Sequence, residues 1–496
     1  MPELLISFRD VTIRVPGEGL FPNIWFDVKE GEHWAFVGEN EALKAALMEA
    51  LAGNVAVTGG RAAYPFFEEY RAAVARDPFL SPHHLIAKVA DRHPFRNLSN
   101  TSQFYYQQRF NSSDSEDALT VHEYLQGIGD GSNDPDFSAL VNRMKLAHLL
   151  DKQLIKLSNG ETKRLLIAAA LLRGPRVLLL VNTFTGLDAA TRESLHGIID
   201  DVAAAGISVI LSTSGTEVPD AITHLARFNA DNTITTVKKG PFALPVQKNE
   251  TESSIDKAEL RDLLATGNRP SFNDIVAMKG VRIRYGEKVI LDDINWIVKQ
   301  GERWAVLGPN GAGKSTLLSL VSADNPQAFA NHIVLFDRKK GSGESIWDIK
   351  RKIGFFSPEL YQYFPLETSC LEAVESGFYD TIGLFRPADP EREGLALRWM
   401  NLLGVAHLSR KALSQVSAVN QRLCLLARAL VKAPPLLILD EPCQGFSSGQ
   451  VAAFKNLVNA ICVESNTTVI YVSHYSEEIP ECVTTVLRLE NGKQVD

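Results

Sequence analysis

The feature that most constrains this chain is an internal duplication. Residues 28–35 (VKEGEHWA) recur as residues 298–305 (VKQGERWA), an offset of 270. Further along, residues 217–219 (EVP) correspond to residues 478–480 (EIP) at an offset of 261. A period this long indicates a duplicated domain, because solenoid repeats are only about 20–50 residues long. The chain is therefore expected to form two copies of one fold.

Within each copy, strand-like apolar runs alternate with helical stretches. A strand, a glycine-containing loop and a helix come first, and a helix, an apolar strand, a helix and another strand follow a long variable middle. This alternation predicts an α/β fold with a parallel sheet flanked by helices. We expect a first domain over 1–232, a linker over 233–272 that is rich in Pro, Gly, Ser and Glu, and a second domain over 273–496.

Composition excludes several function classes. The 496 residues carry 51 basic and 59 acidic side chains, a net charge of −8, so a broad nucleic-acid surface is not expected. The basic cluster at 338–340 and 350–352 is interpreted as a solvated face, with a nucleic-acid patch as the alternative. Five scattered cysteines without a CxxC pair argue against a disulfide framework and a zinc site. No apolar run approaches the ~20 residues of a membrane span, and no secretory signal is recognisable, so we expect a cytoplasmic protein.

The second copy carries a phosphate-loop motif. Residues 308–315 (GPNGAGKS) fit the pattern G-x-x-x-x-G-K-[ST] between an apolar run and a helical stretch. Glycines let backbone N–H groups turn around a phosphate, and the helix N-terminus adds its positive end. Lys314 is expected to reach the β- and γ-phosphates, and Ser315 to bind Mg²⁺. The nucleotide-binding residues predicted in this loop are Gly308, Pro309, Asn310, Gly311, Ala312, Gly313, Lys314, Ser315 and Thr316.

Four further residues complete the predicted site. A buried strand ends in Asp440 and Glu441; we expect Asp440 to hold Mg²⁺ through water and Glu441 to act as the general base. His474 ends the next strand and is expected to contact the γ-phosphate, the alternative being a structural histidine. Tyr285 is expected to stack on adenine, the alternative being an ordinary strand aromatic.

The first copy lacks these residues. In residues 38–45 (GENEALKA), Glu41 and Leu43 replace glycines and Ala45 replaces the serine. Lys44 survives, and alone it is expected to be a surface lysine. At the other matching positions the first copy has residues without the required chemistry: Val181, Asn182, Thr213 and Val15. We therefore expect no hydrolysis at this position.

Together these motifs resemble the ATP-binding cassette (ABC) superfamily, twice, over essentially the whole chain. The resemblance implies two tandem P-loop NTPase domains, each with a mostly parallel core sheet, an antiparallel β-subdomain and a helical subdomain. It implies ATP and Mg²⁺ as ligands. It also implies that residues 157–161 (LSNGE) are an LSGGQ-type signature, which in this family contacts the γ-phosphate of ATP held by the other cassette. Its candidate nucleotide-binding residues are Ser158, Asn159, Gly160 and Glu161.

Without the resemblance, LSNGE is a helix start with Ser158 as N-cap and Glu161 at N3, and both interpretations can hold. At the matching position the second copy has residues 416–420 (VSAVN), where Val419 replaces the glycine. After the carboxylates, the first copy keeps Asp188 where the second has Ser447. Intramolecular head-to-tail pairing of the two halves, as the family implies, would then give one intact and one degenerate composite site.

A narrower resemblance is to the ModF-type family of soluble tandem ATP-binding proteins, named for molybdenum transport and also labelled photorepair proteins. It is carried by residues 308–329 and 335–360, which include the specific motif GSGESIWDIK. In the first copy Gln107 or Gln108 lies where a Q-loop glutamine is expected, the alternative being a polar loop. Residues 355–359 (FFSPE) of the second copy lack this glutamine, which leaves coupling to transport open.

Three function classes follow. The first is an ATP-driven ATPase subunit, as in a molybdate-type transporter, with or without an integral-membrane permease, in the cytoplasm or at the inner face of the plasma membrane. The second is a tandem-ABC translation factor, which the short linker, the negative charge and the degenerate cassette disfavour. The third is a DNA-repair ATPase, which the lack of recognisable zinc modules or long coiled coils disfavours.

Overall fold

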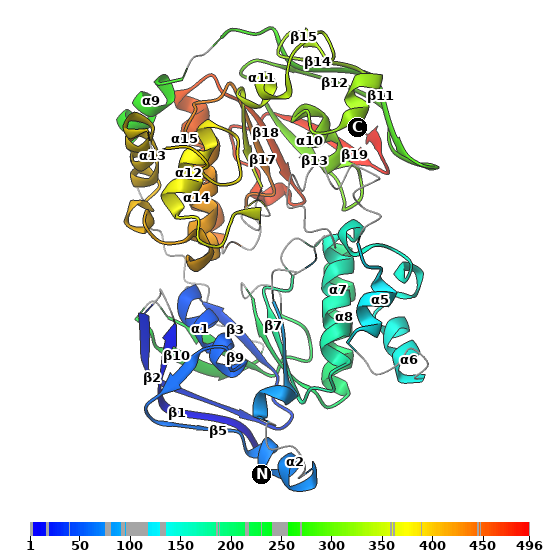
Figure 1. Cartoon of the computed structure of the whole chain (residues 1–496), viewed down its shortest axis with the longest axis vertical. Helices are drawn as coiled ribbons and strands as arrows, with labels where there is room; N and C mark the ends of the chain where they lie inside the picture. The colour runs from blue at the N-terminus through cyan, green and yellow to red at the C-terminus, as the bar shows by residue number, and fades with distance from the viewer. Residues whose placement is uncertain are drawn as a thin grey trace. The chain divides into compact units, whose positions relative to one another are not determined.

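The computed structural model describes residues 3–15, 19–38, 40–74, 81–90, 95, 118–128, 135–184, 187, 189–213, 218–229, 231–240, 256–267, 270–357, 360, 363–387, 389–443, 446 and 448–495. These residues form two compact units, one ending at Gly240 and one beginning at Asp256, each with its own core (Figure 1). No helix in the described ranges is long and apolar enough to cross a membrane.

The first unit is built on a six-stranded sheet. Its order is β10-β9-β3-β8-β7-β6, and every neighbouring pair is parallel except β10 and β9. The bounds are β3 (Trp34–Gly38), β6 (Ile86–Val89), β7 (Val177–Val181), β8 (Ser208–Ser212), β9 (His224–Phe228) and β10 (Ile234–Lys238).

This sheet is covered on both faces. In β7, Leu178 and Leu180 join one apolar cluster, and Val177 and Leu179 join another. That burial explains why the strand is a continuous apolar run instead of an alternating one. The first cluster contains residues of helices α5 (Val121–Gln126), α6 (Pro135–Arg143), α7 (Asn159–Leu171) and α8 (Ala189–Ala204). The second contains residues of α1 (Glu41–Leu51), α2 (Pro65–Val74) and an antiparallel sheet of β1 (Leu4–Val15), β2 (Gly19–Lys29), β4 (Ala56–Thr58) and β5 (Arg61–Ala63).

The second unit repeats this plan. Its six-stranded sheet has the order β20-β19-β13-β18-β17-β16, parallel except for β19 and β20. Its antiparallel sheet has the order β12-β11-β14-β15. The bounds are β11 (Asp274–Tyr285), β12 (Lys288–Lys299), β13 (Arg303–Leu307), β14 (His332–Leu335), β15 (Arg338–Lys339), β16 (Ile353–Phe356), β17 (Leu436–Asp440), β18 (Thr468–Ser473), β19 (Thr485–Glu490) and β20 (Lys493–Val495).

The helices of the second unit also match those of the first. They are α10 (Lys314–Val321), α11 (Ile346–Lys350), α12 (Cys370–Glu375), α13 (Pro390–Leu402), α14 (Ala418–Leu430) and α15 (Ser448–Glu464). Even the local start signals are repeated: α5 begins with a capping box of Thr120 and Glu123, and α12 with one of Ser369 and Glu372. The prediction of two tandem α/β domains, each with a mostly parallel core sheet and an antiparallel sheet, is confirmed.

The predicted linker 233–272 differs from the structure at both ends. Strand β10 pairs with β9 at the edge of the first sheet. Helix α9 (Lys257–Ala265) packs in the second unit against α13 and α15, with Leu260, Leu263 and Leu264 fully buried. Polar and charged residues are frequent in both segments, so their composition resembled that of a linker, although apolar residues of each are used for packing. The described residues leave only 241–255 between the two units.

Candidate functional site

The candidate site of the second unit lies at the carboxyl ends of three adjacent strands, β13, β17 and β18. Leu307 at the end of β13 is in register with Ser473 at the end of β18, and Asp440 at the end of β17 with Val472. Ligands of open α/β sheets bind at this edge. The loop 308–313, the pair Asp440 and Glu441, and His474 all follow these strand ends.

The loop after β13 requires glycine at its first and last positions. Gly308 has φ +155°, and a Cβ there would lie 2.3 Å from the Leu489 carbonyl oxygen. Gly313 has φ +101° and caps α10, where a Cβ would lie 2.6 Å from Leu291 Cδ2. The backbone therefore turns tightly against β19 and β12, and the N-terminus of α10 faces the loop, as phosphate binding requires.

Lys314, the first residue of α10, is only 6 % exposed, so its ammonium group is held inside the loop. Nζ donates hydrogen bonds to the carbonyl oxygens of Gly308 at 2.7 Å and Pro309 at 3.2 Å, and lies 3.2 Å from His474 Nδ1. Two of these contacts are to neutral carbonyl oxygens, and the third is to an imidazole. A buried ammonium surrounded in this way is suited to bind an anionic oxygen.

His474 links the loop to the general-base candidate. Its Nδ1 lies 3.0 Å from the Gly308 carbonyl oxygen, and its Nε2 lies 2.5 Å from Glu441 Oε1. The imidazole of His474 therefore lies directly against the Glu441 carboxylate. The structure thus brings together Lys314, His474 and Glu441, three residues that are 33 or more positions apart in the sequence.

Asp440 and Ser315 are the candidate metal ligands. Asp440 is the half-buried last residue of β17, and Ser315 is an exposed residue in the first turn of α10. A carboxylate and a hydroxyl are hard oxygen donors of the kind Mg²⁺ prefers, so the residues present fit this ion. Thr316, also predicted at the site, is buried behind Ser315, whereas Pro309 and Asn310 are exposed on the loop.

Tyr285 ends β11 beside this loop. The ring is half-buried and packs against the core between the two sheets, and its Oη accepts a hydrogen bond of 3.0 Å from Asn325 Nδ2. Burial raises the pKa of the phenol, so the ring stays neutral. Asn325 fixes the orientation of the ring, a partner that the sequence had not indicated.

The matching loop of the first unit has a different conformation. Helix α1 begins at Glu41, three residues before Lys44, whereas α10 begins at Lys314 itself. Glu41 and Leu43 are therefore helical where Gly311 and Gly313 form the loop. Gly38 is retained for a backbone reason: its φ is +110°, and a Cβ would lie 2.4 Å from the Phe228 carbonyl oxygen.

The expectation that Lys44 is a surface lysine was wrong. Its side chain is 2 % exposed, and Nζ donates a hydrogen bond of 2.7 Å to Glu41 Oε1. The lysine stem packs into the core below α1, and the Glu41 carboxylate occupies the side from which an anion would approach. The sequence indicated that the loop glycines around Lys44 are replaced. It did not show that the carboxylate of Glu41, three residues earlier, would pair with the lysine.

The other matched positions correspond in backbone but not in chemistry. Glu441 has φ +48° and Asn182 has φ +46°. The N–H of each donates to the adjacent strand, to Val472 O at 2.9 Å and to Ser212 O at 3.2 Å. Thr213, at the place of His474, is buried, and its N–H donates to Phe36 O. The first unit therefore keeps the framework without the ionisable side chains.

The segment resembling a signature begins α7. Ser158 and Glu161 form a capping box: Ser158 Oγ accepts from the Glu161 N–H, and the Glu161 carboxylate accepts from the Ser158 N–H at 2.8 Å. Lys152 Nζ donates to the same carboxylate at 2.7 Å. Hydrogen bonds from Lys152 and Ser158 lower the pKa of Glu161, although burial opposes them. Ser158 and Asn159 are exposed at the helix N-terminus.

Gly160 packs inside the unit. A Cβ at this position would lie 2.4 Å from Thr191 Cγ2 of α8. In the second unit, α14 has Ser417 as N-cap, bonded to the Asn420 N–H at 3.4 Å, and no capping box. Val419 is half-buried against the core of that unit. The two helix starts are therefore built differently.

Comparison with known proteins identifies the family. A family model described as ABC transporter matches residues 21–184 and again 291–444. The chain belongs to the ABC transporter family. It is 32 % identical to the ABC transporter ATP-binding protein ModF of Escherichia coli, over 92 % of this chain and 90 % of that protein. It is 29 % identical to an uncharacterized ABC transporter ATP-binding protein of Schizosaccharomyces pombe, over 99 % of both.

A solved complex of an archaeal ribosomal stalk protein with the archaeal ribosome recycling factor aABCE1 matches with TM-score 0.50 and 18 % identity, over 98 % of this chain and 89 % of that one. At this identity the likeness concerns the fold alone. The two ABC domains matched by the family model coincide with the two duplicated units.

Some positions of interest in the ABC domains lie outside the described residues. They are Gln107, Gln108, Gly186, Asp188, Gly445 and Ser447. In the segment resembling a Q-loop of the second unit, β16 ends at Phe356, and Ser357 is buried.

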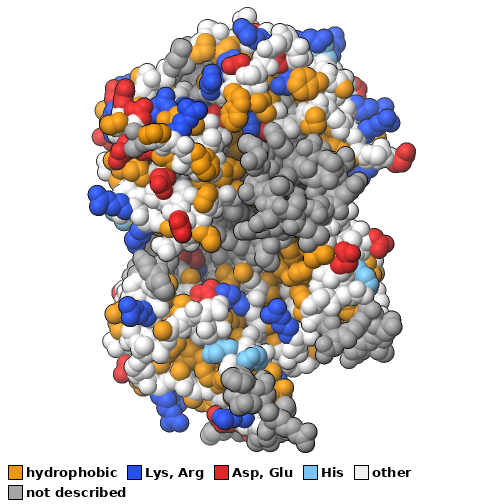
Figure 2. All heavy atoms as spheres, viewed as in Figure 1, with side chains coloured by type: hydrophobic (Ala, Val, Ile, Leu, Met, Phe, Trp, Pro, Cys, Tyr) orange, Lys and Arg blue, Asp and Glu red, His pale blue; other side chains and the backbone are white. Residues whose placement is uncertain are grey.

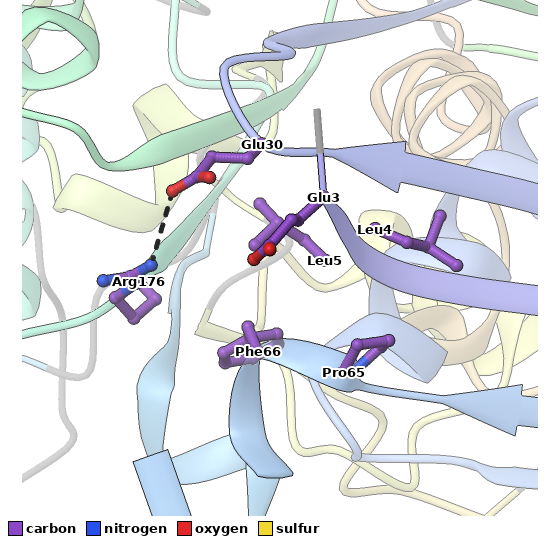
Figure 3. Close-up of a pocket in the computed structure, with 7 residues that line it drawn as sticks. All are labelled: Glu3, Leu4, Leu5, Glu30, Pro65, Phe66 and Arg176. Carbon is purple, nitrogen blue, oxygen red and sulfur yellow. Dashed lines mark ion pairs between the residues drawn. The ribbon is translucent and has the colours of Figure 1, made fainter. Parts of the chain in front are cut away.

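A pocket in the first ABC domain is unrelated to this site. About 230 Å³ in volume, it is lined by Glu3, Leu4, Leu5, Glu30, Pro65, Phe66 and Arg176, with Arg176 and Glu30 paired at 3.7 Å (Figure 3). Arg176 precedes β7 and Glu30 precedes β3, so the pocket lies at the amino ends of the parallel strands. The nucleotide edge of the fold is the opposite one.

Proposed function

We propose that this protein binds and hydrolyses MgATP at one competent site, which belongs to the second ABC domain. The observation that carries the proposal is the contrast between two nearly buried lysines. Lys314 is surrounded by carbonyl oxygens and His474, whereas Lys44 is already paired with the Glu41 carboxylate. Lys44 can offer its charge to a phosphate only if this ion pair breaks.

Each residue has a chemical role in the proposal. Lys314 and the N–H groups of the loop hold the phosphates. Ser315 and Asp440 hold Mg²⁺, which neutralises charge that develops during phosphoryl transfer. Glu441 accepts a proton from the attacking water, and His474 Nε2 lies against that carboxylate. Tyr285 offers a ring, fixed by Asn325, for adenine to stack on.

The signature of the first ABC domain completes the proposed site. Ser158, Asn159, Gly160 and Glu161 form a helix N-terminus whose exposed part carries a hydroxyl, and the positive end of the helix is suited to a γ-phosphate. We propose that the two halves pair head to tail, so that this helix closes over ATP bound to Lys314. Binding would then close the halves, and hydrolysis would open them.

The stoichiometry of nucleotide binding tests the single-site proposal. Isothermal titration of the full chain with MgATP, in the Glu441→Gln form to prevent turnover, should give one tight site per chain. The Lys44→Ala form should bind equally well, and the Lys314→Ala form should lose the tight site. Two tight sites per chain, or loss of the tight site in Lys44→Ala, would contradict the proposal.

For the biological role, we propose an ATPase component of a transporter, acting with an integral-membrane permease at the cytoplasmic face. Similarity to ModF over nearly the full length supports this role. Among the described side chains on the face in Figure 2, acidic and basic groups are interspersed over both units, which does not favour a broad nucleic-acid surface.

The alternative is an ABC-type translation or repair ATPase that acts without a permease. The two roles are separated by affinity capture of the Glu441→Gln chain from detergent-solubilised membranes and from cytosol, with and without ATP. Recovery of an integral-membrane protein that depends on ATP supports the transport role. Recovery of ribosomes or DNA-repair proteins instead would replace it with the alternative.

A further inference from the structure

A pair of cysteines meets in the second ABC domain although twenty positions separate them. Cys462 lies in α15, and Cys482 lies in the segment before β19. Their sulfur atoms are 3.0 Å apart. Disulfide sulfurs are about 2.05 Å apart, so a shift of roughly 1 Å would bring these two into bonding distance.

Solvent reaches only one cysteine of this pair. Cys462 is fully buried and Cys482 is half-buried. The hydrogen bond that the two thiols share and the charge of Arg303 lower the pKa of the Cys482 thiol, against the effect of burial. Sharing that proton, together with burial, raises the pKa of Cys462. Because Cys482 is the more exposed of the two, an oxidant reaches it first, and the buried Cys462 is placed as the resolving thiol.

The segment that carries Cys482 is docked along one stripe of α15. Lys455 Nζ donates to Glu477 O at 2.7 Å, and Asn459 Oδ1 accepts from the Cys482 N–H at 2.9 Å. Cys462 follows three residues later on the same helix face. This segment begins directly after His474, so the contacts fix the chain that leaves the candidate site.

The first unit shows that the fold does not need the sulfur atoms. There the Ala221 N–H donates to Asp200 Oδ1 at 2.7 Å, the same contact as that of Cys482 with Asn459. By this match, Ala203 and Ala221 stand at the places of Cys462 and Cys482. The same docking is achieved with two alanines, so packing alone does not account for the thiol pair.

We propose that Cys462 and Cys482 are a redox modification site that forms a reversible disulfide and ties the segment after His474 to α15. With hydrogen peroxide as the oxidant, Cys482 attacks one oxygen and becomes a sulfenic acid, releasing water. Cys462 then attacks that sulfur, the S–S bond forms and a second water leaves. Two thiols are oxidised, and one peroxide is reduced to two waters.

The test is peroxide titration of the reduced full chain, followed by mass spectrometry. Lys455 and Arg488 bound one tryptic peptide, 456–488, which contains both cysteines. We expect this peptide to lose two hydrogens, and its fragments to stay joined after further cleavage at Glu464 until a dithiol reductant is added. Thiol loss at Cys462 and Cys482 should be at least tenfold faster than at Cys370 and Cys424, which are fully buried.

Matched variants separate this role from a structural one. The double variant Cys462→Ala/Cys482→Ala copies the first unit, and should fold and lose the fast phase of thiol oxidation. Cys462→Ala alone should leave Cys482 as a sulfenic acid that dimedone traps. If Cys482→Ala does not slow thiol loss, or if Cys482 in the natural chain oxidises to sulfinic acid without a linked product, the proposal is wrong.

Discussion

The two matching loops of this protein differ in the groups that contact their buried lysine. Both place a lysine nearly out of solvent, with 6 % of Lys314 and 2 % of Lys44 exposed. In the second unit Lys314 contacts the carbonyl oxygens of Gly308 and Pro309 and the His474 ring, and in the first Lys44 pairs with Glu41 at 2.7 Å. The comparison teaches that the same buried lysine can stand in two different local environments.

A shift in helix start underlies this difference. Three extra residues join α1 at its N-terminus, which carries Glu41 in the first turn, where an acidic side chain is favourable. The helix N-terminus that would have faced a phosphate is thus satisfied by the Asn40 cap and by Glu41. Glu41 and Leu43, which stand where the second unit has Gly311 and Gly313, thus belong to a helical turn instead of a loop.

The largest expected effect comes from the general base. Glu441→Gln keeps the side-chain shape and can still contact His474, but it cannot accept a proton. Turnover of ATP should fall by about 10²–10⁴-fold while MgATP binding is retained. Asn182→Gly, at the matching position with a compatible backbone, should leave turnover unchanged. A comparable loss in both variants would mean that the two sites are not functionally distinct.

The lysines should give the next largest contrast, in affinity. Removal of the Lys314 ammonium loses a charge-assisted contact of about 1.5–3 kcal/mol, so the Kd for MgATP should rise by about 10- to 100-fold in Lys314→Ala. Lys44→Ala should not change the Kd. Equilibrium titration of both proteins measures this, and equal weakening would remove the basis for assigning one competent site.

A smaller effect on turnover is expected from the signature. Asn159→Asp adds a carboxylate to the first residue of α7, which favours the helix but repels a γ-phosphate. Turnover should fall by about tenfold, equivalent to ~1.4 kcal/mol. Gly160→Asp should stop hydrolysis altogether. It is the less specific variant, because the new side chain would contact Thr191 and strain the fold as well.

The mirror change, Ala418→Asp at the first residue of α14, is the matched control and should leave turnover unchanged. If it is as damaging as Asn159→Asp, both signatures contribute. If Asn159→Asp has no effect, the halves do not close head to tail on one ATP, and LSNGE is only a helix cap.

The smallest expected effect is on stability alone. Lys44→Met keeps the apolar stem but removes the charge that Glu41 contacts, at a cost of about 1 kcal/mol. The melting transition of the first unit should fall by about 2–4 °C, with unchanged ATP turnover. Addition of Glu41→Gln should restore most of the loss. A turnover defect without a melting shift would assign Lys44 to the nucleotide site instead.

The fold could be predicted from the sequence because its signals are local or repeated. The apolar runs of β7 and β17, the capping boxes and the offset between copies all persist in the structure. The linker was predicted less well. Leu260, Leu263 and Leu264 of α9 are spaced for one helix face, but only the structure shows that this face meets α13 and α15.

The site was predictable where chemistry and spacing coincide, and not where contacts depend on side-chain direction. Lys314, Asp440 and Glu441 belong to motifs and lie at adjoining strand ends. The Lys44–Glu41 pair and the approach of Cys462 to Cys482 had no comparable signal. The sequence does not tell whether a lysine ammonium points to solvent or to a carboxylate. No spacing rule relates two cysteines that are twenty residues apart.

The positive φ shared by Glu441 and Asn182 points to a trade-off between activity and folding. A residue with a side chain loses about 1–2 kcal/mol in the left-handed region, and asparagine tolerates that region better than glutamate. The second unit thus holds the proposed general base in a conformation that opposes folding, and the first unit has a residue that relieves this strain. Selection for thermal robustness alone would favour asparagine or glycine at both places. Retention of glutamate at 441 is what selection for turnover would produce.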